Sequence, residues 1–407
     1  MNPNNIRQDF PVLSRKINGK PIIYMDSACM SLRPIQVIDA INNYYKNFPA
    51  CAGRSNHKLG REVTEAVNKA REDIRKFFNA KSSKEIVFTK NTTEAINLVA
   101  NSFDFKEGDV VITSDREHNS NLMPWQVLSK TKGIVHKFVK SNDDNTFNID
   151  NFKKIINENK GRVKLVSMVH TSNLDGYTLP VKEIIKISHD NKALVLLDAA
   201  QSAPHKELDV RKLDADFLAC SGHKMLGPSG IGILYAKQNL LESMSPFMVG
   251  GDTVINTTYD SFQLEEPPEK FEAGLQHYSG IIGFGEAVKY LMKIGRNDIS
   301  NHEVKLNKIV TNGFNDIDKI SIIGPKNPEL RSGIISFNIK NTDPHEVAGM
   351  LDSSANIMVR SGMHCVHSWF NARNIKGSVR ASLYLYNTED EAKILIEEVK
   401  KIVKVVG

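Results

Sequence analysis

Short apolar runs alternate with helix-like segments through the middle of this 407-residue chain, and this alternation constrains the fold more than any other feature. Most of the runs are continuously apolar, which is typical of strands covered on both faces. We therefore predict an α/β fold around a mostly parallel, buried sheet. The candidate strands are residues 85–89, 110–113, 164–170, 193–198, 216–219 and 230–235, and the candidate crossover helices are residues 92–101 and 181–191.

The pattern changes beyond about Tyr290. A helical segment over residues 302–317, a strand over 333–339 and a long amphipathic helix over 388–406 follow one another there. We expect a large domain over residues 24–289. A smaller α+β domain is expected over residues 290–407, together with the N-terminal segment 1–23.

The charges are balanced and interspersed, because 53 Lys and Arg accompany 47 Asp and Glu, for a net charge of +6. No block of like charges indicates a nucleic-acid or membrane arm, and no apolar stretch resembles a membrane span or a signal peptide. The four cysteines are too far apart for a close-spaced disulfide framework or a zinc motif. We expect a cytoplasmic protein with reduced thiols, no metal, and neither nucleic acid nor membrane as a partner.

Lys224 follows a predicted strand, in the Gly-rich turn Ser221-Gly222-His223-Lys224. Ligands of open α/β sheets bind beyond the carboxyl ends of the strands, and a desolvated lysine can form a Schiff base. The alternative is a solvated lysine in a surface turn. Asp198, at the end of another apolar strand, favours the first interpretation, because a carboxylate there can keep the pyridine nitrogen of pyridoxal phosphate protonated. Asp198 can also cap a helix, and the two roles are compatible.

A phosphate site is expected where the strand at residues 85–89 leads into a helix. Asn91 is a candidate N-cap for this helix, and Glu94 has the spacing of a capping box. The backbone amides and the positive end of such a helix attract phosphate. The pattern is common, so it supports the site only together with Lys224 and Asp198.

Eight blocks between residue 24 and about residue 386 belong together: residues 24–28, 91–97, 117–121, 170–173, Asp198-Ala199-Ala200-Gln201, Ser221-Gly222-His223-Lys224, Phe271-Glu272-Ala273-Gly274 and Arg360-Ser361-Gly362-Met363-His364-Cys365. In this order they resemble the class V aminotransferase family of fold-type I pyridoxal phosphate enzymes. The similarity is strongest to the SufS-type branch of cysteine desulfurases and selenocysteine lyases. The resemblance implies a seven-stranded, mostly parallel sheet in the large domain.

The resemblance also implies a role for each matching residue. Pyridoxal 5'-phosphate is expected as the cofactor, bound covalently to Lys224 and contacted by Thr92, Thr93, His118, Asn173, Asp198, Gln201, Ser221 and His223. His118 is expected to stack on the ring and to be catalytic, together with Lys224 and Cys365. Arg380 is expected to clamp the substrate carboxylate, for which a planar guanidinium is well suited. The further substrate contacts are expected to be Arg360, Ala28 and Asn173. Without the resemblance, Arg380 could instead form a surface ion pair with Glu389 or Asp390.

Cys365 decides which reaction the resemblance implies. In the SufS-type branch, a loop cysteine at this position attacks the sulfur of L-cysteine, which leaves L-alanine and a persulfide on the enzyme. His364, His367 and Arg360 are expected to lower the pKa of the Cys365 thiol. A buried, inert cysteine is the alternative, but the flanking residues are too polar for a core strand. A zinc site is a poor alternative, because three ligands within four residues cannot surround one ion.

The resemblance further implies a homodimer, a sulfur-acceptor or scaffold protein as a partner, and a place in iron–sulfur cluster assembly. Three departures from the family pattern are Asn119, Met363 and the pair Leu275-Gln276. The last one stands where the family has the threonine that contacts the phosphate of the partner subunit, so that contact is in question. The alternatives to a cysteine desulfurase are another lyase, a selenocysteine lyase, an epimerase, an aminotransferase or a silent scaffold of the same fold.

Overall fold

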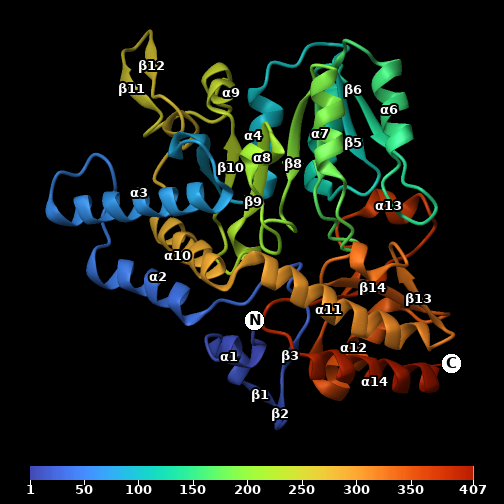
Figure 1. The fold of residues 1–407 in the computed structure, drawn as a ribbon. Helices are drawn as coiled ribbons and strands as arrows, with labels where there is room; N and C mark the ends of the chain where they lie inside the picture. The colour runs from blue at the N-terminus through green and yellow to red at the C-terminus, as the bar shows by residue number, and fades with distance from the viewer. Residues whose placement is uncertain (407) are drawn as a thin grey trace.

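A seven-stranded sheet forms the centre of the computed structural model, which describes residues 1–406 (Figure 1). The strand order is β4-β10-β9-β8-β7-β5-β6. Strand β10 is antiparallel to both of its neighbours, and the other four pairings are parallel. The strands are β4 (Ile86–Thr89), β5 (Val110–Ser114), β6 (Val135–Val139), β7 (Val163–Val169), β8 (Leu194–Asp198), β9 (Phe217–Ser221) and β10 (Gly232–Ala236).

The predicted fold class is confirmed, and so are the six predicted strands, with bounds that shift by at most two residues. The missed strand is β6, at the edge of the sheet. Its central residues His136, Lys137 and Phe138 are partly or largely exposed, so it has no continuous apolar run to mark it. An edge strand can tolerate such residues because one of its sides meets solvent.

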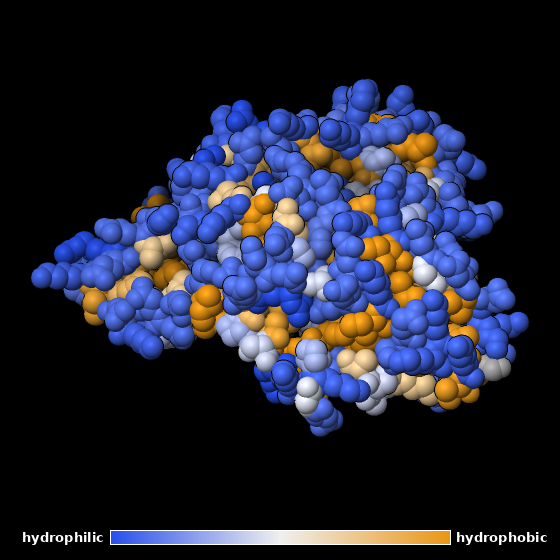
Figure 2. Space-filling model, turned by 60° about the horizontal axis from the view of Figure 1, so that its bottom comes forward, coloured by the Kyte–Doolittle hydropathy of each residue, from blue (hydrophilic) through white to orange (hydrophobic). Residues whose placement is uncertain are grey.

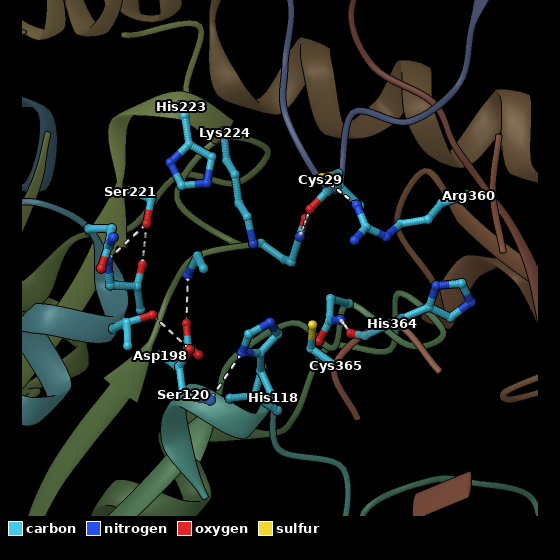
Figure 3. Close-up of a pocket in the computed structure, with 18 of the residues that line it drawn as sticks. Cys29, His118, Ser120, Asp198, Ser221, His223, Lys224, Arg360, His364 and Cys365 are labelled. Atoms are coloured by element: carbon cyan, nitrogen blue, oxygen red, sulfur yellow. Dashed lines mark hydrogen bonds between the residues drawn. The ribbon is translucent and has the colours of Figure 1, made fainter. Parts of the chain in front are cut away.

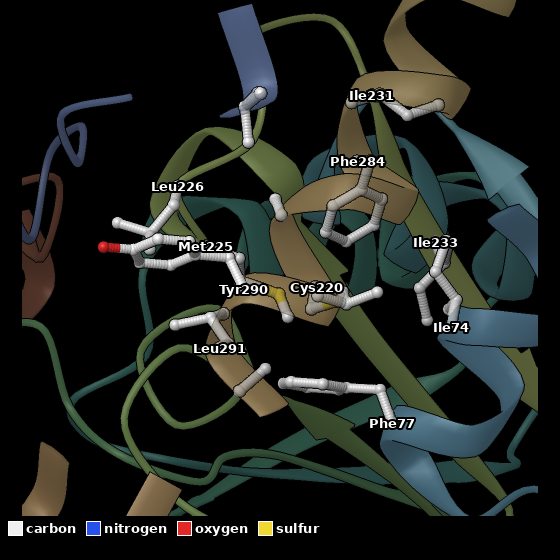
Figure 4. Close-up of a cluster of buried hydrophobic side chains, with 14 of the residues drawn as sticks. Ile74, Phe77, Cys220, Met225, Leu226, Ile231, Ile233, Phe284, Tyr290 and Leu291 are labelled. Atoms are coloured by element: carbon white, nitrogen blue, oxygen red, sulfur yellow. The ribbon is translucent and has the colours of Figure 1, made fainter. Parts of the chain in front are cut away.

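Successive residues of a strand supply two different cores, which explains the continuous apolar runs. In β9, Phe217 and Ala219 face one core, whereas Leu218 and Cys220 face the other. Figure 4 shows the second of these, where Cys220 and Ile233 meet Phe77 and Phe284 from the helices that cover the sheet. The covering helices are α3 (Lys58–Phe78), α4 (Thr92–Ser102), α5 (Met123–Thr131), α6 (Ile149–Glu158), α7 (Val181–Asp190) and α10 (Tyr278–Ile294).

A second, antiparallel sheet lies below the central one in Figure 1, with the strand order β13-β14-β17-β16. Its strands are β13 (Ile320–Ile323), β14 (Ile334–Ile339), β16 (Arg360–Gly362) and β17 (Ser378–Ser382). The helices α11 (Arg296–Asn315), α12 (Pro344–Ala355) and α14 (Glu389–Val406) accompany it. From the N-terminal segment, β3 (Ile23–Tyr24) pairs in parallel with β15 (Ile357–Met358). The division into two domains at residue 290 stays a prediction, and α10 runs across that position.

The remaining elements are short or lie at the periphery. They are α1 (Pro3–Arg7), α2 (Ile35–Asn47), α8 (Val210–Leu213), α9 (Gln238–Ser243), α13 (His367–Asn371), the pair β1 (Lys16–Ile17) and β2 (Lys20–Pro21), and the hairpin β11 (Val254–Thr257) and β12 (Phe262–Leu264). The surface in Figure 2 is mostly hydrophilic, with separate apolar patches. Within residues 1–406, no helix has the length and apolar character that a membrane crossing requires.

A buried ion pair ties α3 to the central sheet. Arg71 donates from both Nη atoms to Glu272, at 2.7 and 2.8 Å, and Glu272 Oε1 also accepts the backbone N–H of Phe88 at 2.7 Å. The Arg71 guanidinium lies over the Phe88 ring, 4.3 Å from its centroid. Glu272 belongs to the Phe271-Glu272-Ala273-Gly274 block, so this block has a structural role that the sequence did not reveal.

We expect Glu272→Gln to lower the free energy of unfolding by about 3–5 kcal/mol, because it leaves the buried Arg71 charge without its partner. Urea denaturation measures this change. Glu397→Gln is the matched control, since its pair with Lys400 is exposed and contributes at most about 1 kcal/mol. An equal decrease in the free energy of unfolding in both variants would show that the buried Arg71–Glu272 pair stabilises the fold no more than an exposed ion pair does.

Candidate active site

A cavity of about 240 Å³ opens between the carboxyl ends of the central strands and the four-stranded sheet. Figure 3 shows side chains from both sheets pointing into it. Every site residue predicted from the sequence lines this cavity: Ala28, Thr92, Thr93, His118, Asn173, Asp198, Gln201, Ser221, His223, Lys224, Arg360, Cys365 and Arg380. The cavity is also lined by Asn91 and His364, which the sequence analysis named as an N-cap and as a neighbour of Cys365. The lining residues that it did not name are Cys29, Ser120, Val169 and Ala200.

The ends of β8 and β9 place Asp198 and Lys224 on the cavity wall. Asp198 is buried and accepts the backbone N–H of Ala200 at 2.9 Å. The segment after it forms turns, so Asp198 caps a turn and not a helix. Burial raises the pKa of Asp198, although the bond from Ala200 and the charge of Lys224 oppose this rise. Burial lowers the pKa of Lys224 against the opposing charge of Asp198, so its amine loses its proton more readily than a surface lysine.

The start of α4 forms the expected polar cradle. The Asn91 side chain accepts the Glu94 N–H at 3.0 Å, which confirms the N-cap. The capping box is wrong, because the Glu94 carboxylate accepts the backbone N–H of Lys90 and not that of Asn91. Thr92 donates its N–H to Ser221 Oγ at 2.9 Å, and the two hydroxyls are 2.7 Å apart. Hydroxyl groups from α4 and β9 therefore meet at one end of the cavity.

His118 lies between Asp198, at the end of β8, and Cys365 (Figure 3). Its Nδ1 accepts the backbone N–H of Ser120 at 3.1 Å, and Ser120 Oγ is 2.7 Å from Thr93 Oγ1. Burial, together with the charge of Lys224, lowers the pKa of His118 to about 3. The imidazole is therefore uncharged at neutral pH.

Three buried polar atoms of the cavity wall have no partner among the described residues, and they mark where a polar ligand fits: Gln201 Oε1, His364 Nδ1 and Arg380 Nε. Gln201 donates Nε2 to the Ala28 carbonyl at 2.6 Å, which leaves its Oε1 unpartnered. Arg380 donates Nη1 to the Asn173 carbonyl at 3.0 Å and Nη2 to Asp26 at 3.4 Å, which leaves its Nε unpartnered. Buried groups of this kind normally have partners, so these atoms favour a bound ligand with its own donors and acceptors.

Arg380 is almost fully buried in the middle of β17, with only 2% of its surface exposed. Its ion pair is with Asp26, whereas Glu389 pairs with Lys305. The alternative of a surface ion pair with Glu389 or Asp390 is therefore wrong. A buried guanidinium facing a cavity is suited to bind a carboxylate.

Cys365 lies on the loop after β16, is partly exposed, and has a φ of 60°. Its carbonyl accepts the Asn119 N–H at 2.8 Å, and Asn119 Nδ2 lies 2.9 Å from His367 Nδ1. His364 is buried, with Nε2 2.9 Å from Ser378 Oγ. Burial, followed by the charges of Arg380 and Arg360, lowers the pKa of His364 to about 2. The expectation that His364 supplies positive charge to the thiol is therefore wrong, because its ring stays neutral.

The pair Leu275-Gln276, whose contact with a partner subunit is in question, lies outside the cavity of Lys224. Leu275 is 72% exposed, and Gln276 donates Nε2 to the carbonyl of Glu272 at 2.9 Å. Gln276 lines a separate cavity of about 230 Å³ that also includes Arg54. Neither Leu275 nor Gln276 lines the cavity of Lys224.

The cavity combines side chains of both sheets, and comparison with known proteins shows which family has this arrangement. The chain belongs to the class-V aminotransferase family, whose model matches residues 23–395. Among its relatives, a probable cysteine desulfurase of Synechocystis sp. is 41% identical over 98% of this chain and 95% of its own length. A probable cysteine desulfurase of Halalkalibacterium halodurans is 40% identical over 98% of both chains. The apo structure of a cysteine desulfurase from Thermococcus onnurineus covers 99% of both chains, with 37% identity and a TM-score of 0.94.

Proposed function

We propose that this protein is a cysteine desulfurase that uses pyridoxal phosphate to convert L-cysteine to L-alanine and retains the sulfur as a persulfide on Cys365. One observation carries the proposal: a partly exposed cysteine lines the same cavity as Lys224, the buried carboxylate of Asp198 and the buried guanidinium of Arg380. The relatives named as cysteine desulfurases, at about 40% identity over nearly the whole chain, support it. The family match supports the choice of cofactor.

The cavity wall fits the chemistry of pyridoxal phosphate. Lys224 would hold the cofactor covalently, Asp198 would accept a hydrogen bond from the ring nitrogen, and the uncharged His118 would cover the ring face. Asn173 and Gln201 would bond the ring oxygen side, and Thr92, Thr93, Ser221 and His223 would surround the phosphate. When bound, pyridoxal phosphate accepts the electrons that are released when the substrate loses its α-proton.

Two residues of the chain would carry out the reaction: Lys224 would transfer the proton, and Cys365 would accept the sulfur. Lys224 Nζ would accept the α-proton of the substrate, and its lowered pKa favours the neutral amine that this step needs. Cys365 Sγ then attacks the substrate sulfur as a thiolate. The bond between the substrate's Cβ and sulfur would break as an Sγ–S bond forms, and the electron pair of the broken bond would stay with the carbon skeleton. That skeleton would gain two protons, the α-proton held by Lys224 and the proton released by the Cys365 thiol, and would leave as alanine.

Arg380 is proposed to bind the substrate carboxylate, with Arg360, Ala28 and Asn173 around it. We expect Arg380→Lys to raise the KM for L-cysteine by at least about tenfold, because an ammonium cannot form two parallel bonds, and each charge-assisted bond contributes about 1.5–3 kcal/mol. Steady-state kinetics measure this, and Arg162→Lys, at an exposed position, is the control. An unchanged KM for Arg380→Lys would place the guanidinium away from the substrate.

We further propose a homodimer and a sulfur-accepting protein partner. Exposed apolar side chains on and near the β11–β12 hairpin support a protein interface there, including Ile255 at 54% and Phe262 at 69% exposure. A persulfide needs an acceptor thiol to complete the cycle, which supports the second partner. The two-domain division, with the cofactor held by residues 24–289, is part of the same proposal.

Product analysis with L-cysteine tests the proposed function. The purified holoenzyme, with a thiol reductant present, is expected to form L-alanine and sulfide in equal amounts. Pyruvate, ammonia and sulfide would instead indicate an eliminating lyase, and this outcome would overturn the proposal. A protein that binds the cofactor but leaves L-cysteine unchanged would indicate a silent scaffold or a different substrate.

A further inference from the structure

A second thiol, that of Cys29, lines the cavity in addition to the thiol of Cys365. The Sγ of Cys29 accepts a hydrogen bond from Arg360 Nη1 at 2.5 Å, and both residues belong to the cavity wall (Figure 3). Cys29 is partly buried and follows the segment Tyr24-Met25-Asp26-Ser27-Ala28. None of the roles proposed above uses this sulfur.

The arginine that Cys29 contacts is in an unfavourable position. Arg360 in β16 lies directly opposite Arg380 in β17, in antiparallel register. Like charges directly opposite each other destabilise a pair of strands, unless other groups compensate them. Arg380 has Asp26 and the Asn173 carbonyl as partners, at 3.4 and 3.0 Å. The charge of Asp26 also acts on the Arg360 guanidinium, and Arg360 Nη1 donates a hydrogen bond to the sulfur of Cys29.

Cys29 is the fixed member of the Cys29–Arg360 pair. Its N–H donates to the Asp26 carbonyl at 3.0 Å. The preceding residue, Ala28, is held on both sides, since its N–H donates to Ser382 Oγ at 2.9 Å and its carbonyl accepts from Gln201 at 2.6 Å. The arginine side chain, by contrast, has several rotatable bonds, and ordering it costs conformational entropy. The sulfur therefore determines the direction in which the guanidinium points.

We propose that Cys29 is a positioning residue for Arg360. Its sulfur holds the Arg360 guanidinium beside that of Arg380, so that an amino acid carboxylate meets two preoriented cations in place of one. This inference rests on the proposed function only in naming L-cysteine as the amino acid. Cys29 itself neither reacts with the substrate nor carries the sulfur.

The first test compares the kinetics of three variants. Cys29→Ala is expected to raise the KM for L-cysteine by about three- to tenfold, a larger factor than any fall in kcat, because it removes one hydrogen bond that orients Arg360. Cys29→Ser keeps an acceptor at this position and is expected to restore KM to within about twofold of the wild type. Cys51→Ala, in an exposed loop, is the control for loss of a cysteine as such. An unchanged KM in Cys29→Ala, with full cofactor occupancy, would overturn the proposal.

The second test does not depend on turnover. L-alanine is titrated into each holoenzyme, and its dissociation constant is read from the change in visible absorption of the bound cofactor. Cys29→Ala is expected to weaken L-alanine binding by the same three- to tenfold. In an Arg360→Ala background, Cys29→Ala is expected to have no further effect, since the group that the sulfur orients is gone. An effect of equal size in both backgrounds would show that Cys29 acts through general packing and not through Arg360.

The two tests separate this inference from the proposed function. If the wild type forms no alanine from L-cysteine, the desulfurase proposal fails, but the alanine titration still measures the link between Cys29 and Arg360. If the wild type desulfurates cysteine and Cys29→Ala binds alanine as the wild type does, only the role of Cys29 fails. Melting temperatures of all the variants show whether folding contributes.

Discussion

The Cys365→Ala enzyme should bind pyridoxal phosphate as the wild type does, yet its release of L-alanine and sulfide from L-cysteine should fall on the order of 10³-fold or more, as expected when a nucleophile is removed. The thiol makes none of the contacts proposed for the cofactor. The hydrogen bond between the Asn119 N–H and the Cys365 carbonyl uses backbone atoms only, so it survives the substitution. Alanine takes the same backbone conformation with no more strain than cysteine.

Mass spectrometry of the wild type locates the sulfur. The reaction is stopped before any reductant is added, and the peptide that holds Cys365 should carry one extra sulfur atom, while those of Cys29, Cys51 and Cys220 should not. Selenocysteine is a second test substrate: Cys365→Ala should still turn it over, because its carbon–selenium bond breaks more readily than the carbon–sulfur bond of cysteine. Cys51→Ala is the matched control for activity. Wild-type turnover of cysteine by Cys365→Ala would move the assignment to another class V activity and leave the roles of Lys224 and Asp198 in place.

Replacement of Lys224 should abolish both turnover and covalent attachment of the cofactor. In Lys224→Ala, the cavity wall loses its one amine, and no other lysine lines the cavity in the described part of the chain. The α-proton then has no acceptor of suitable pKa, so we expect turnover to fall on the order of 10³-fold or more. Noncovalent binding should persist, because the hydroxyl cradle and Asp198 remain.

Borohydride reduction and peptide mapping provide the measurement for Lys224. The wild type should carry the reduced pyridoxyl group on the Lys224 peptide, and Lys224→Ala should carry none. Lys137→Ala, at an exposed position of β6, should be labelled and active like the wild type. A label on any other lysine of the wild type would show that the proposed attachment site is wrong.

The sequence predicted the central sheet well, because buried parallel strands have the most uniform pattern a strand can have. The end of β8 at Asp198 and the turn that holds Lys224 were both found in this way. Strand β6 escaped detection because its exposed residues break the apolar run. The capping role of Glu94 was also misassigned, since the spacing of residues cannot show that its carboxylate reaches Lys90 and not Asn91.

The members of the site followed from short blocks that resemble a family, and the structure brings all of them to one cavity. Two aspects could not be read from the sequence. The charge state of His364 depends on its burial, and its polar sequence neighbours gave no sign that it is buried. The contact between Cys29 and Arg360 joins residues 331 positions apart, and no pattern within either segment announces it.

Lys224 and Asp198 come from the central sheet, whereas Arg360, Arg380 and Cys365 come from β16, β17 and the loop that follows β16. A protein engineer can therefore treat cofactor loading and substrate choice as separately adjustable properties. Libraries restricted to residues 360–382 would vary the two arginines proposed to bind the carboxylate and the cysteine proposed as the nucleophile, while the residues around Lys224 stay intact. The visible colour of each purified variant would report loading, independently of which amino acid the variant consumes.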